Sequence, residues 1–115
     1  MDGRTQLPAI NFLMNHFNVL YVDSVTEPGP IALMSEAPES QETMNIYKRL
    51  AISVEKHKSV GIAIVAHYDC AGNPVSKEKQ LVQLKDAATH VKKHYPHLPV
   101  IELWVNENWE VEELS

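Results

Sequence analysis

The sequence contains one cysteine, Cys70, among its 115 residues, which excludes a disulfide within the chain. No apolar run approaches the roughly 18 residues that a membrane span requires. The first residues, Met-Asp-Gly-Arg-Thr-Gln, lack the charged and apolar regions of a secretory signal peptide. These absences predict a soluble protein in the reducing cytoplasm, with no membrane partner.

Basic residues are also scarce, because ten Lys and Arg face fifteen Asp and Glu and leave a net charge of −5. Nucleic-acid binding usually needs a basic surface, so we expect no nucleic-acid partner. The two basic clusters, 56–58 and 92–94, fall where helices are predicted to end, and cations there complement the helix dipole. The acidic stretch 107–113 is typical of a solvated edge.

The length fits one domain, 1–115, with its own hydrophobic core. Hydrophobic residues make up 44% and charged residues 22% of the chain, as in ordinary globular proteins. Three stretches have the apolar spacing of amphipathic helices, namely 7–17, 44–57 and 76–95. Ser40 and Ser76 are candidate N-caps for the second and third of these helices.

Four stretches have strand-like composition: 18–23, 31–34, 60–66 and 99–105. The third is apolar on both faces, which is typical of a central parallel strand covered by helices. Strands separated by helices imply crossover connections. We therefore predict an α/β fold in three layers, with a mostly parallel sheet of about four strands and helices on both faces.

Ligands of such sheets bind beyond the carboxyl ends of the strands. Asp23 follows the first predicted strand and the loop 67–74 follows the third, so both should lie at one edge. In that loop His67 and Cys70 offer an imidazole and a thiol, both good zinc ligands. Asp23 is the best-placed third ligand. The predicted metal site is therefore His67, Cys70 and Asp23 with Zn²⁺.

A purely structural role explains the same residues without a metal. Free cysteines are often buried as small apolar side chains. His67 can bond to a loop carbonyl, and Asp69 can cap the turn. A His-x-x-Cys pair by itself is a weak signal, so both explanations stay open at this point.

The stretch Ile64-Val65-Ala66-His67-Tyr68-Asp69-Cys70-Ala71-Gly72 resembles the second zinc motif of the β-class carbonic anhydrases. In that family a hydrophobic strand ends in a histidine that is followed by Cys and Gly. The resemblance extends over about 18–105, with 67–72 as its specific part. It implies a β-carbonic-anhydrase-like fold, zinc bound to His67 and Cys70, and a homodimer.

The sequence departs from the other motif of this family, Cys-x-Asp-x-Arg. Alignment on Asp23 places Tyr21 at the zinc-binding cysteine and Val25 at the arginine. The resemblance implies that Asp23 is the catalytic aspartate, or that it replaces the missing thiolate as a third ligand and leaves water in the fourth position. Zinc bound without the second thiolate should be held more weakly unless such a ligand compensates.

Three functions remain open from the sequence. The first is a diverged family member that has lost catalysis and binds a small molecule, an anion or nothing. The second is a zinc-dependent lyase or hydrolase that acts on CO2 or a related small molecule. The third is metal-free thiol chemistry, with Cys70 as nucleophile and His67 as base. We also expect a homodimer, because a short sheet leaves an exposed edge, and the segment 109–111 is a candidate part of its interface.

Overall fold

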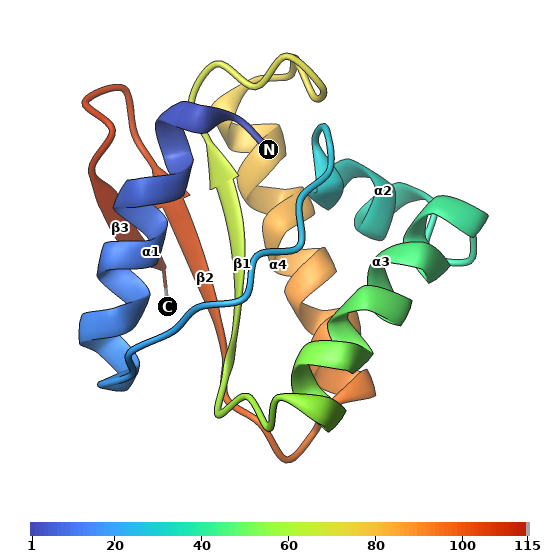
Figure 1. The fold of residues 1–115 in the computed structure, drawn as a ribbon. Helices are drawn as coiled ribbons and strands as arrows, with labels where there is room; N and C mark the ends of the chain where they lie inside the picture. The colour runs from blue at the N-terminus through green and yellow to red at the C-terminus, as the bar shows by residue number, and fades with distance from the viewer. Residues whose placement is uncertain (115) are drawn as a thin grey trace.

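A computed structural model of the chain describes residues 1–114, which fold into helices packed on a three-stranded sheet (Figure 1). This arrangement confirms the mixed α/β class. In chain order the elements are α1 (Gly3–Phe17), α2 (Pro30–Glu36), α3 (Gln41–Ala51), the π-helical turn η1 (Ile52–Lys56), β1 (Ile62–His67), α4 (Lys77–His94), β2 (Val100–Val105) and β3 (Val111–Leu114).

The strand order is β1-β2-β3. β1 and β2 are parallel, in register from Ile62 opposite Val100 to His67 opposite Val105, and α4 forms the crossover between them. β3 pairs antiparallel with β2. The prediction of about four strands in a mostly parallel sheet is therefore wrong, since the described residues form one parallel and one antiparallel pair.

The predicted strand 18–23 is wrong, because these residues form no strand and pair with none, and Asn18 has a left-handed backbone. It belongs to the segment 18–29, which leaves α1, passes beside β1 and leads to α2 (Figure 1). Its β-branched and aromatic residues favour an extended backbone, but a strand also needs a hydrogen-bonded neighbour. The composition could not predict the missing pairing.

The predicted strand 31–34 is wrong as well, because these residues form part of α2. Pro30 occupies the first turn, where its fixed φ suits a helix and its missing N–H costs nothing. Ile31 and Met34 lie three residues apart and are both buried, as on one face of a helix. An apolar run of four residues does not distinguish the two conformations.

The other predicted elements are confirmed with shifted ends. The predicted helices correspond to α1, to α3 with η1, and to α4; the two remaining predicted strands are β1 and β2. Ser40 accepts a hydrogen bond from the Thr43 N–H at 3.2 Å, and Ser76 accepts one from the Lys79 N–H at 3.2 Å, so both are N-caps. The basic cluster 56–58 begins in the last turn of η1, and the cluster 92–94 lies in the last turn of α4.

The two faces of the sheet pack against different helices. On one face, alternate residues of β1 and the fully buried Trp104 of β2 contact the apolar stripe of α4, which is Leu84, Ala87, Ala88 and Val91. On the other face Leu103 and Val105 are completely buried and α1 lies over the strands (Figure 1). None of the helices within residues 1–114 is both long enough and apolar enough to cross a membrane.

Candidate functional site

The loop 67–74 leaves β1 at its carboxyl end and is held by amide side chains of α4. Gln80 Nε2 donates to the carbonyl oxygen of His67 at 3.0 Å. Asn73 Nδ2 donates to Gln83 Oε1 at 2.7 Å, and both of these side chains belong to buried residues. Gln83 Nε2 in turn donates to Glu36 Oε1 of α2 at 3.0 Å. This chain of bonds fixes the loop relative to two helices.

Arg4, in the first turn of α1, connects the loop with the hairpin between β2 and β3. Its guanidinium donates to Asp2 Oδ2 at 2.6 Å, to Asp69 Oδ2 at 3.4 Å and to the Asp69 carbonyl at 3.3 Å. The guanidinium carbon also lies 4.3 Å from the ring centre of Trp109. Hydrogen bonds from Arg4 hold the pKa of the Asp2 carboxyl well below its usual value.

The three predicted metal ligands each have another environment in this structure. His67 Nδ1 lies 2.7 Å from the carbonyl oxygen of Tyr68. Cys70 is a free, buried cysteine with 9% of its surface exposed. Asp23 Oδ2 lies 2.6 Å from Nδ1 of His57. The hydrogen bond with His57, and to a lesser extent the Ser53 hydroxyl, lower the pKa of the Asp23 carboxyl.

The placement of these three side chains does not form a zinc site in this structure. Within residues 1–114, no three or more His, Cys, Asp and Glu side chains gather closely enough to hold a metal. The contact of His67 Nδ1 with a carbonyl leaves Nε2 free, as in histidines that bind zinc, but Asp23 is hydrogen-bonded to His57, and His67, Cys70 and Asp23 do not form a metal-binding group. Tyr21, at the position of the missing cysteine, is 87% exposed.

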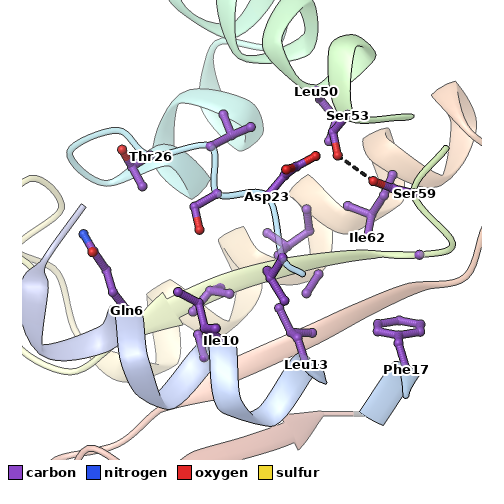
Figure 2. Close-up of a pocket in the computed structure, with 18 of the residues that line it drawn as sticks. Gln6, Ile10, Leu13, Phe17, Asp23, Thr26, Leu50, Ser53, Ser59 and Ile62 are labelled. Atoms are coloured by element: carbon purple, nitrogen blue, oxygen red, sulfur yellow. Dashed lines mark hydrogen bonds between the residues drawn. The ribbon is translucent and has the colours of Figure 1, made fainter. Parts of the chain in front are cut away.

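Asp23 and His67 do line the same cavity, which has a volume of about 1060 Å³. It lies between α1, the segment 18–29 and β1, with α3 and η1 at one end (Figure 2). The Asp23 side chain approaches this end, where Ser53 and Ser59 are hydrogen-bonded to each other at 2.6 Å (Figure 2). Half of the lining residues labelled in Figure 2 are apolar and come from several elements: Ile10, Leu13, Phe17, Leu50 and Ile62.

Sequence reasoning missed four residues that shape this region: Arg4, His57, Gln80 and Gln83. A signal existed for the two glutamines, because both lie on the apolar side of the third predicted helix, and a polar residue there needs a hydrogen-bond partner. No local signal could pair His57 with Asp23 or Arg4 with Asp69, since 34 and 65 residues separate these partners.

The fold and the loop together define a class: an α/β protein with a parallel β-α-β unit and a His-x-x-Cys loop at the carboxyl end of its first strand. The whole chain, residues 1–115, matches the protein family described as "Putative carbonic anhydrase". The chain therefore belongs to this family, which confirms the resemblance seen in the sequence. The searches of curated proteins and of solved structures returned no match.

Proposed function

We propose that this chain is a carbonic-anhydrase-family protein that has lost zinc-dependent CO2 hydration and serves as a binding protein. One observation carries the proposal: the side chains of His67, Cys70 and Asp23 do not converge on a common point. A catalytic zinc site needs three protein ligands and an open fourth position for water. The hydrogen bond between Asp23 and His57 holds the proposed third ligand on another partner.

The sequence of the segment 18–29 supports the same proposal. Tyr21 and Val25 stand where the family resemblance places a cysteine and an arginine, so a phenol replaces the thiolate and an apolar side chain replaces the cation. The side chain of Tyr21 is largely exposed to solvent. The cavity beside Asp23 offers a binding function that needs no metal.

The second candidate is a zinc-dependent lyase that acts on CO2 or a related small molecule, with His67, Cys70 and Asp23 as ligands. Family membership and the short spacing of His67 and Cys70 within one loop favour it. It would require the side chains of Asp23, His67 and Cys70 to move together, and the hydrogen bond between Asp23 and His57 opposes this movement. Thiol chemistry at Cys70 is the least supported, because a nucleophile must be accessible and this side chain is buried.

Metal analysis combined with CO2 hydration kinetics tests the proposal. We expect purified protein, incubated with zinc and desalted, to retain no stoichiometric zinc and to hydrate CO2 no faster than buffer. His67→Ala and Cys70→Ser should then leave both measurements unchanged. About one zinc per chain that both variants lose, with a hydration rate that Cys70→Ser abolishes, would instead establish the lyase.

A further inference from the structure

The segment 18–29 runs beside the free edge of β1 in the same direction as that strand (Figure 1). Just before the segment, the ring of Phe17 lies against Gly61, which immediately precedes β1. At its end, Gly29 packs on Gly72 in the loop that follows β1. The two ends of the segment are therefore fixed at the two ends of one strand, as those of a neighbouring parallel strand would be.

The segment and the facing edge of β1 both have unpaired backbone groups. Within residues 1–114, no backbone group of residues 20–25 is bonded to another backbone group. On β1, the Ile62 and Tyr68 N–H groups donate toward the β2 side, to the Pro99 and Val105 carbonyls, at 2.9 Å each. Alternate residues face the other way, so the backbone groups of Ala63 and Val65 point to the free edge. Pairing of the segment with β1 would satisfy both sets of groups.

The composition and length of the segment fit a strand at this edge. Residues 19–22 are Val, Leu, Tyr and Val, which favour extended backbone. In the observed position the side chains of Leu20 and Tyr21 are 77% and 87% exposed. The six residues of β1 cover about 20 Å at about 3.3 Å per residue. The segment 18–29 is longer than β1, so it has slack to reach the edge.

One side-chain hydrogen bond holds the middle of the segment at the amino end of β1. Asp23 Oδ2 lies 2.6 Å from Nδ1 of His57, and both side chains are partly exposed, so this contact is weak. Farther along, Arg49 Nη1 donates to the Thr26 carbonyl at 3.3 Å and fixes that part of the segment to α3. Residues 18–25 can therefore move once Asp23 leaves His57, and the cavity of about 1060 Å³ gives them room.

We propose that residues 18–25 form a strap that closes onto the free edge of β1 as a fourth, parallel strand, and that the observed arrangement is its open position. The contact of Phe17 with Gly61 sets the register, because six residues farther along each chain Asp23 comes level with His67. Closing therefore carries Asp23 from the amino end to the carboxyl end of β1.

Closing also fills the cavity that lies between the strap and β1. The strap and a ligand in this cavity then exclude each other, so the strap regulates access to the cavity. This consequence rests on the proposed binding function, whereas the pairing of the strap with β1 does not.

Amide hydrogen exchange of the full chain, followed by NMR without added metal or ligand, tests the strap. We expect the amides of Ala63 and Val65 to exchange about tenfold or more slowly than unstructured amides, because closing pairs them. Nuclear Overhauser effects between residues 19–23 and 62–66 should accompany this protection. The Ile64 amide, which faces β2, is the internal standard and should stay protected throughout.

Two sets of variants move the strap in opposite directions. His57→Ala removes the bond that holds Asp23 and should raise the protection of Ala63 and Val65 by about threefold, the size expected for a partly exposed pair. His97→Ala, which removes an exposed histidine outside the cavity, is the matched control and should change nothing. Tyr21→Pro and Val22→Pro each remove one N–H, and only one of these two neighbouring groups can face β1. One proline should therefore abolish the protection and the other should retain most of it.

Two results would overturn the strap. The first is exchange of Ala63 and Val65 at unstructured rates, without the Overhauser effects, in both the parent protein and His57→Ala. The second is protection that neither proline variant lowers, because slow exchange would then come from burial alone. Thermal unfolding checks that the proline variants fold, and the Overhauser effects of the parent protein decide if they do not. Zinc retention and CO2 hydration test the proposed function separately, so the two proposals fail independently.

Discussion

At the scale of single residues, the hydrogen bond between Asp23 and His57 lowers the pKa of the Asp23 carboxyl. Asp23 Oδ2 lies 2.6 Å from Nδ1 of His57. The histidine comes just after η1, in a basic cluster that sequence reasoning assigned to the helix dipole. The structure gives the cluster a second role, since one of its members holds the carboxylate at the end of the cavity.

We predict that the pKa of Asp23 lies below its usual value and rises toward that value in His57→Ala. The hydrogen bond from His57 is the larger cause of the lowering, with Ser53 second. A lowered pKa in the folded state stabilises the protein above the usual carboxyl pKa, and this contribution is lost as the pH falls through the folded-state pKa. A carboxyl-detected NMR titration measures both proteins, and an equal Asp23 pKa in the two would contradict the contact.

At the scale of elements, a close contact of two glycines attaches the segment 18–29 to the loop 67–74. A Cβ atom on Gly72 would lie 2.6 Å from the Pro28 carbonyl carbon and 2.8 Å from the Gly29 nitrogen. Gly29 has a φ of +57°, a conformation that glycine adopts without strain. The contact brings the segment after Asp23 against the loop that carries His67 and Cys70.

We predict that Gly72→Ala destabilises the protein by about 1–3 kcal/mol, because backbone atoms must move to admit the methyl group. Gly3→Ala is the matched control, since no atom lies within 4 Å of its added Cβ and alanine favours the first turn of α1. The control should be neutral or stabilising by up to about 1 kcal/mol. Urea unfolding measures both variants, and equal midpoints for Gly72→Ala and the parent would show that this contact is loose.

At the scale of the whole molecule, the sheet has two edges with different side chains. The outer edge is β3, with exposed Glu112 and Glu113, and charged residues disfavour pairing with another sheet. The other edge is β1, with Ala63 and Val65 and no charged residue between 62 and 66. Trp109, which begins the segment 109–111 predicted as a candidate part of the interface, packs within its own chain against Arg4 and Tyr68.

A homodimer remains a prediction, as does the cytoplasmic location. Several large apolar side chains are exposed and favour association: Leu7, Leu20, Tyr21, Val60 and Val82. Sedimentation equilibrium should give the mass of two chains, and Tyr21→Glu should shift the population toward one chain if the surface of the segment 18–29 forms the interface. A mass of one chain for the parent protein at all concentrations would contradict the dimer.

The sequence by itself determined the features that depend on local order. Apolar periodicity placed α1, α3 and α4, the serines at 40 and 76 identified two helix starts, and continuous apolar runs placed β1 and β2. The His67–Gly72 motif pointed to the family that the whole chain matches. These signals are readable because helix spacing, capping and short motifs involve residues within a few positions of one another.

Only the tertiary structure decided which side chains meet. The segment 18–23 has strand composition but lies outside the sheet, because pairing depends on a partner more than forty residues away. The same long-range geometry directs Asp23 to His57 instead of to His67 and Cys70, and opens the cavity along β1. The residue types at the carboxyl end of a strand indicate which chemical groups are available there. The packing of the whole chain determines which of these groups come together to form a site.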